Sequence, residues 1–188
     1  MLEIPEDRCE QHRLFKAIDD AFRAGDFDAL GQALGGSERW FDEEMPCEFG
    51  LGHPLEYAIY WSPLALIEQL IRAGSDVNYQ DNAGFPSLIA ALSTKRADKL
   101  EILELLIRHG ADLHQRGIND WTPLHYAAST HNLDAMRLLV AAGANPMIRT
   151  RIDTLATPRE EAEAAGYLEG ASLLRRAEEQ HRGNGRGP

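Results

Sequence analysis

A short frame recurs along the chain and predicts a stack of small helical units. Its clearest copy is Thr122-Pro123-Leu124-His125, followed by a glycine at Gly143. The helix-ending glycines, 36 and 33 residues apart, are Gly74, Gly110 and Gly143. The leucines that open the helix pairs, 33 and 36 residues apart, are Leu55, Leu88 and Leu124. Units this short cannot bury an apolar face alone, so each must pack against its neighbours.

The two spacings disagree, and the disagreement locates an insertion. The chain spans 19 residues from Leu55 to Gly74, and 19 again in the unit that opens at Leu124, but 22 in the unit that opens at Leu88. Three extra residues therefore fall within residues 93–99, between the two helices of that unit. Insertions in repeat arrays collect in loops because the stacking faces cannot absorb them.

Apolar spacing within the frame predicts amphipathic helices. In residues 133–140 the apolar positions i, i+3, i+6 and i+7 are Leu133, Met136, Leu139 and Val140. Residues 64–71 and 100–107 repeat this phasing. Proline at Pro123 and Pro158 suits a first helical turn, and the recurring glycines suit left-handed helix ends.

The regions outside the regular frame are predicted to close the stack. Residues 14–18 and 26–30 read as a helix pair joined at Gly25, without the proline turn, as in an atypical terminal cap. Residues 35–50 lack a period and are predicted to be an extended connection partly packed against the first full unit. The predicted organisation is a capping pair and connection at 1–49, repeats at 50–177 and a disordered tail at 178–188.

These motifs resemble those of the ankyrin-repeat family. The family's threonine-proline-leucine-histidine turn is matched at residues 122–125, and its glycine-alanine-aspartate turn at residues 110–112. The unit at Leu88 departs from the pattern with Pro86-Ser87, and the unit at Leu55 with His53-Pro54. The last unit reads Thr157-Pro158-Arg159-Glu160, with two extra residues in the hairpin before it. The resemblance implies an all-α ankyrin-repeat solenoid of stacked helix pairs joined by β-turn or hairpin loops, with about five units including terminal caps.

Charge and composition narrow the class of partner. The net charge is −11, and residues 1–50 contribute −8 of it, from 13 acidic and 5 basic side chains. Nucleic-acid binding is disfavoured because a phosphate backbone would meet a repulsive field. The acidity favours solubility or attraction of a basic protein partner. The chain has no apolar run of membrane-spanning length, so no membrane association is expected.

Targeting and redox signals point to the cytoplasm. The first residues are acidic, which argues against a targeting segment. The two cysteines, Cys9 and Cys47, lie outside the regular repeats. A disulfide between them remains an alternative, but reduced thiols in the cytoplasm are expected of a chain with so few cysteines. A monomer is expected, because the acidic cap disfavours self-association through an open end of the stack.

Nothing in the sequence nominates catalytic chemistry. His109 and His114 are five residues apart across a turn, which is not the spacing of a helical metal pair. The resemblance implies that His125 hydrogen-bonds within its own turn. The acidic cluster at residues 42–48 lacks the order of a calcium loop. No nucleophile, base and oxyanion donor occur together, so we predict a protein that is not an enzyme and has no cofactor or metal.

The resemblance also implies where a partner binds. Ankyrin arrays usually meet partners on a concave face made by hairpin tips and the first helix of each pair. By register, the candidate partner-binding residues are Tyr60, Trp61, Asn82, Phe85, Arg116, Ile118, Asn119 and Trp121. Exposed aromatic side chains are typical of interface hot spots. We expect a hydrophobic strip of Trp61, Phe85 and Trp121, with packing within the stack as the alternative.

Three functions fit these expectations. The first is a non-catalytic module that binds a protein through the concave face. The second, a more specific version of the first, is an inhibitor or immunity-type protein that neutralises a basic toxin or enzyme. An adjacent toxin-like reading frame would favour this function. The third is a ligand-sensing regulator that uses the basic residues Lys95, Arg96 and Lys99 of the insertion.

Overall fold

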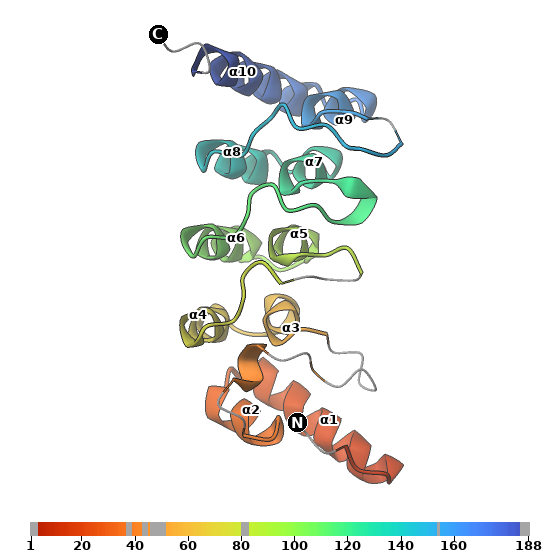
Figure 1. Ribbon diagram of the computed structural model, residues 1–188, viewed down its shortest axis with the longest axis vertical. Coiled ribbons are helices and arrows are strands. Elements are labelled where there is room, and N and C mark those ends of the chain that lie inside the picture. The colour runs from red at the N-terminus through yellow and green to blue at the C-terminus, as the bar shows by residue number, and fades with distance from the viewer. Residues whose placement is uncertain are drawn as a thin grey trace.

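The computed structural model describes residues 4–36, 39–42, 45, 52–79, 83–153 and 155–184, the side chain of residue 184 excepted. Within these ranges the chain forms five stacked helix pairs and no β-strand, which confirms the predicted all-α solenoid (Figure 1). The pairs are α1 (Arg8–Ala24) with α2 (Phe27–Ala33), α3 (Pro54–Trp61) with α4 (Leu64–Ala73), α5 (Ser87–Ser93) with α6 (Lys99–Arg108), α7 (Pro123–Ser129) with α8 (Leu133–Ala141), and α9 (Pro158–Ala164) with α10 (Leu168–Asn184).

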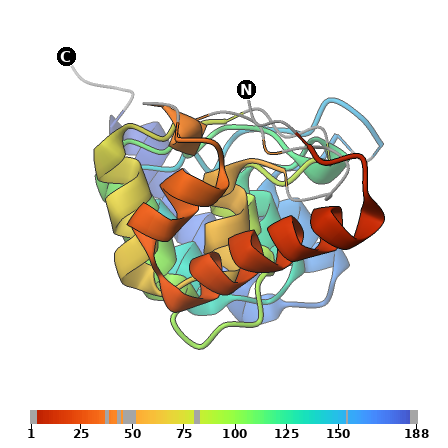
Figure 2. The ribbon, with the colours of Figure 1, turned by 90° about the horizontal axis from the view of Figure 1, so that it is seen from below.

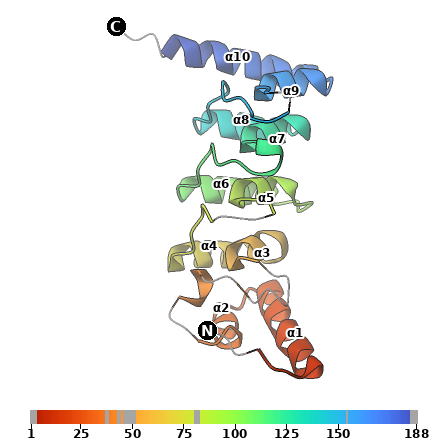
Figure 3. The same cartoon turned by 45° about the vertical axis from the view of Figure 1, so that its right-hand side comes forward.

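The first helices of successive pairs form one column and the second helices another (Figures 1 and 3). A loop precedes each of α5, α7 and α9, and we call these the hairpin loops. Because the first helices run in the same direction, they begin along one edge of the array and end along the other. We call these the hairpin edge and the turn edge.

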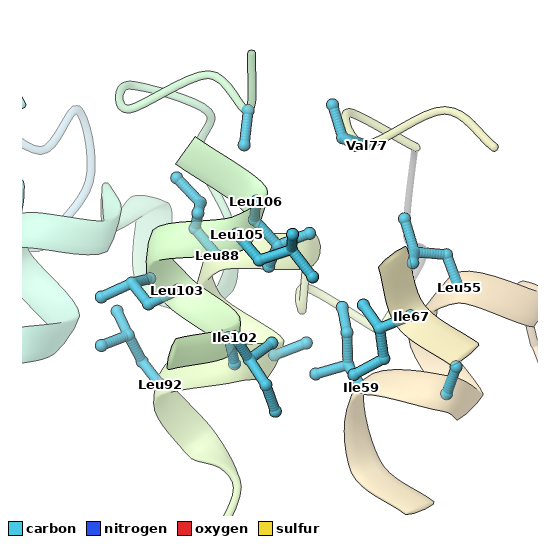
Figure 4. Packing of buried hydrophobic residues seen from close by; sticks show 14 of the residues in the cluster. Leu55, Ile59, Ile67, Val77, Leu88, Leu92, Ile102, Leu103, Leu105 and Leu106 are labelled. Atoms are coloured by element: carbon cyan, nitrogen blue, oxygen red, sulfur yellow. The ribbon is translucent and has the colours of Figure 1, made fainter. Parts of the chain in front are cut away.

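One continuous apolar core runs along the stack. Leu88 of α5 and Ile102 of α6 are buried, as are Ile59 of α3 and Ile67 of α4. Figure 4 shows these two layers facing each other across the boundary between neighbouring pairs. Since burial of one such side chain stabilises the fold by about 1.5–3 kcal/mol, each pair depends on its neighbours for stability.

The first helices are capped in different ways. Thr157 and Glu160 form a reciprocal capping box at the start of α9, and the Thr157 backbone N–H donates to Glu160 at 2.9 Å. The corresponding residue in α5 is Ile89, which is buried and cannot cap. Gly25 at the end of α1 and Gly74 at the end of α4 adopt the left-handed conformation that suits a glycine after a helix.

The predicted capping pair at the N-terminus is confirmed as α1 and α2, joined at Gly25. The connection after it packs on the first full unit as expected, but residues Trp40–Asp42 form a short 3₁₀ helix, η1, instead of extended chain. Trp40 packs against Phe27 with ring centroids 4.8 Å apart. The Ser75 hydroxyl donates to the Phe41 carbonyl at 2.6 Å, which ties η1 to the end of α4. Phe49 of the same segment lies outside the described residues.

The expected disordered tail at 178–188 is wrong for residues 178–184, which continue α10. The helix persists because Leu174 and Ala177 are buried against the preceding layer. The next residue, Glu178, is only 4% exposed and accepts from Arg159 of α9 at 3.1 Å. A charge-assisted contact of this kind extends packing beyond the point where the apolar pattern ends.

The insertion predicted within residues 93–99 is confirmed as a five-residue loop, residues 94–98, between α5 and α6. The loop projects from the turn edge, away from the hairpin loops (Figure 2). Arg96 donates to both Asp98 carboxylate oxygens at 2.8 and 2.6 Å and to the carbonyls of Ser62 and Ile59. Arg96 therefore closes the end of α3 and pairs with Asp98.

Candidate protein-binding surface

Hydrogen bonds across the repeats hold the hairpin edge in register. The Asn78 side chain accepts from the Asp112 backbone N–H at 2.7 Å, one unit further along the chain. His114 repeats this contact in the next unit, where its Nε2 accepts from the Asn145 N–H at 2.9 Å. His114 thus has a stacking role, and its neighbour Asp112 takes part in the same ladder. Such bonds satisfy backbone groups that would otherwise lack partners between the layers.

The hairpin loop before α7 is pinned to the loop before it. It contains the 3₁₀ turn η3 (Ile118–Asp120), and the Ile118 N–H donates to the Gly84 carbonyl at 2.8 Å. A Cβ on Gly117 would lie 2.4 Å from the Gly84 oxygen and 2.7 Å from Cδ1 of Ile89. Gly117 is therefore needed because the two loops approach too closely for a side chain.

Asp120 joins two hairpin loops through arginines. Its side chain is 8% exposed and accepts from Arg116 at 2.5 Å and from Arg151, in the following loop, at 2.6 Å. The Arg151 side chain lowers the pKa of the Asp120 carboxyl, as the backbone N–H of the same residue also does. Arg116 donates further to the Arg149 carbonyl at 3.0 Å. This arrangement fixes the relative position of the loops before α7 and α9.

His125 links the same two layers from inside. It is fully buried, and its Nε2 donates to the Ala156 carbonyl at 3.0 Å. Its Nδ1 therefore accepts from the Thr122 backbone and hydroxyl, at 3.3 and 2.8 Å. Burial lowers the pKa of His125, against the opposing effect of the Ala156 carbonyl and of Glu161. The predicted bond within the turn is confirmed, and the bond to the next unit adds to it.

A hollow of about 220 Å³ lies between these loops on the hairpin edge. Its lining residues are Asn119, Trp121, Thr150, Ile152, Asp153 and Glu161. Trp121 is half-buried and meets Tyr126 edge-on, with ring centroids 6.3 Å apart. Both Asn119 and Asp153 have left-handed backbone, with φ of 56° and 55°. The hollow therefore combines an indole wall, an aliphatic side chain and two carboxylates.

Trp61 belongs to a separate cluster on the turn edge. It ends α3, and its side chain is 51% exposed. The guanidinium carbon of Arg23 in α1 lies 4.8 Å from the centroid of the indole ring. Asp19 accepts from Arg23 at 2.8 and 2.9 Å and from the Tyr57 hydroxyl at 2.5 Å. The hydrogen bond from Arg23 lowers the pKa of Asp19, while burial and then Asp19 raise the pKa of Tyr57 to about 12.

A family model described as ankyrin repeats in three copies matches residues 54–150, just over half of the 188 residues. The chain belongs to the ankyrin-repeat family. The matched range contains the pairs α3/α4, α5/α6 and α7/α8, so the first and last helix pairs lie outside it. A search of curated proteins finds no match to the chain. Ankyrin repeats are generally protein-protein interaction modules and are typically not catalytic.

Three further observations on the ankyrin array concern metal ions, membrane-spanning helices and the cysteines. Among the described residues, no group of three or more His, Cys, Asp or Glu side chains is placed to hold a metal ion. None of the helices in the described ranges is long and apolar enough to cross a membrane. Cys9 is exposed and unpaired, whereas Cys47 lies outside the described residues.

The expected strip of Trp61, Phe85 and Trp121 is not continuous. Trp61 is the last residue of α3, whereas Phe85 and Trp121 each precede a first helix by two residues. At 1.5 Å per residue, a seven-residue helix separates the two edges by about 10 Å. The register assigned all three residues to one face, but it did not distinguish the two ends of the helices.

The remaining predicted residues fall into three groups. Asn82 lies outside the described residues. Tyr60, Phe85 and Arg116 are half-buried and bonded within the array, as when the Tyr60 hydroxyl meets Ser93 Oγ at 2.8 Å. Ile118 and Asn119 are exposed at the tip of the loop before α7, and Ile118 is 37% exposed.

Sequence reasoning missed the hairpin loop before α9. Its Ile152 and Leu155 are 50% and 52% exposed, and Ile152 and Asp153 line the hollow together with Trp121. The signal was present in the two extra residues before Pro158, because a longer loop places its tip further out. No register inherited from a shorter loop could assign these positions.

Proposed function

We propose that this ankyrin array is a non-catalytic module that binds a protein through the hairpin loops and first helices. The observation that carries the proposal is where large apolar side chains remain exposed. Among the described residues there are five, and three of them lie in the hairpin loops before α7 and α9: Ile118, Ile152 and Leu155. The other two are Trp61, which ends α3 beside Arg23, and Leu168, which begins α10. Exposed apolar side chains that gather on one face are typical of interaction sites.

The rigidity of this face supports the same function. The Ile118–Gly84 bond, the contacts of Asp120 and the His125–Ala156 bond each join neighbouring units at the hairpin edge. A surface that is already ordered loses little conformational entropy on binding, so more of its contact energy is available for affinity.

The test is affinity capture of partners from native lysate, with mass spectrometry, followed by affinity measurement on the captured protein. Trp121→Ala is expected to weaken binding by tenfold or more, as is typical of aromatic side chains at interface centres. Leu168→Ala is the matched control, since it removes a 74% exposed apolar side chain away from the hairpin loops. A Trp121→Ala protein whose melting temperature falls sharply while its affinity is unchanged would show that Trp121 only seals the stack.

A further inference from the structure

The hollow beside Trp121 has the composition of a site for a charged and flat group. Trp121 provides an indole wall and Ile152 an aliphatic one, while Asp153 and Glu161 provide carboxylates. No cationic residue lines it. An apolar side chain bound here would remove water from the Asp153 carboxylate without replacing its hydrogen bonds, which is unfavourable.

The arginines of the two loops are engaged elsewhere. Arg116 and Arg151 share Asp120, and Arg149 pairs with Glu160 at 2.8 Å. Among the described residues, no ion pair includes Asp153, whose carboxylate is therefore not neutralised by a neighbour. Asp153 lines the hollow from a position with left-handed backbone.

Elsewhere in the same chain, an indole ring and a carboxylate hold an arginine side chain. At the N-terminal end, Arg23 lies over the Trp61 ring at 4.8 Å and donates to the Asp19 carboxylate at 2.8 Å. An indole face together with a carboxylate thus already binds a guanidinium in this molecule. At Trp121 the same two chemical groups line a hollow, and no cation–π contact covers that ring among the described residues.

We propose that the hollow receives an arginine side chain of the protein partner, with its guanidinium stacked on Trp121 and hydrogen-bonded to Asp153. This inference rests on the proposed protein-binding function and names the chemistry that the hairpin edge selects. Arginine fits better than lysine because its planar guanidinium stacks on an indole and bonds a carboxylate through two N–H groups. The net charge of −11, of which residues 1–50 carry −8, attracts a basic partner to the molecule as a whole.

The test titrates the folded protein with the peptide acetyl-Gly-Arg-Gly-amide and follows the tryptophan indole N–H signals by NMR. The chain has three tryptophans, so the Trp121 signal is assigned by its loss in Trp121→Phe. The control peptide replaces arginine with citrulline, which has nearly the same shape but no charge. We expect a saturable shift of the Trp121 signal with arginine, and binding at least tenfold weaker with citrulline.

Asp153→Asn removes the negative charge and keeps the backbone conformation, because asparagine also tolerates a left-handed conformation. It should weaken arginine binding at least tenfold without loss of stability. Asp134→Asn, an exposed carboxylate change on α8, should leave binding unchanged. Absence of a Trp121 shift, equal shifts with both peptides, or unchanged binding in Asp153→Asn would each overturn the inference. The captured partner would still depend on Trp121 if only this inference fails, so the two failures are distinguishable.

Discussion

Two tryptophans lie near carboxylates in this array, and only one of them is covered from within the chain. Trp61 is covered by Arg23, which Asp19 holds in place, so the N-terminal layer completes its own contact. Trp121 borders a hollow whose carboxylate, Asp153, has no ion pair among the described residues. The same two chemical groups therefore serve cohesion at one end of the molecule and remain available at the other.

The difference follows from what lies beside each tryptophan. Trp61 lies beside the last turn of α1, from which Arg23 reaches the ring. Trp121 meets a loop whose arginines are already engaged by Asp120 and Glu160. The capping helix α1 thus covers the Trp61 ring, whereas the loops before α7 and α9 leave the Trp121 ring beside the hollow.

The largest loss of stability is expected from Gly117→Ala, which perturbs the hairpin edge alone. The added methyl group would lie 2.4 Å from the Gly84 oxygen, so the loop that carries Trp121 must shift. Overpacking of this kind destabilises proteins by about 1–3 kcal/mol, and backbone contact places this case near 3. Chemical denaturation measures the loss, and NMR should show a displaced Trp121 signal with the Trp61 signal unchanged.

Gly183→Ala is the matched control for that change, because nothing lies within 4 Å of a Cβ at Gly183 in α10. It should be neutral or slightly stabilising, since alanine favours helix. Equal stability of the wild-type protein and Gly117→Ala would contradict the close approach of the two loops.

A smaller loss of stability is expected at acidic pH, and it depends on His125 at the same edge. Burial lowers its pKa below the ordinary value of 6.5, so below that pH the unfolded chain binds a proton that the folded chain does not. Its contribution to stability is therefore fully present above about pH 6.5 and is lost as the pH falls. One such group gives a slope of at most about 1.4 kcal/mol per pH unit.

Denaturation of wild type and His125→Gln at several pH values between 5 and 7.5 measures this slope. The wild-type curve should fall more steeply toward acid, and the difference between the two proteins should shrink. His181→Gln, at an exposed position on α10, should keep the wild-type slope. Parallel curves for wild type and His125→Gln would show that His125 does not couple the layers to pH.

The repeat frame predicted the stacking and the loop insertion because both depend on local spacing. It could not predict the two tryptophan environments, since each is built from elements of different units. Arg23 reaches Trp61 from a helix that lacks the repeat motif, and Asp153 reaches the hollow from a loop of unusual length. Register assigned Arg116 to the partner surface, but its contacts with Asp120 and Arg149 give it a structural role.

The smallest effect, and the sharpest test of the comparison, is expected from Arg23→Gln. Its side chain is 49% exposed, and exposed ion pairs and cation–π contacts are each worth about 0.5 kcal/mol, so stability should change little. The change leaves the Asp19 carboxylate and the Trp61 ring without their arginine. If an indole beside a carboxylate is enough to bind a guanidinium, the arginine peptide should now shift the Trp61 signal as well.

Lys16→Gln, which removes another exposed cation from α1 that pairs with Asp20, should not produce this second site. A Trp61 signal that stays unresponsive in Arg23→Gln, while Trp121 binds the peptide, would mean that the enclosing shape of the hollow is needed in addition to its chemistry.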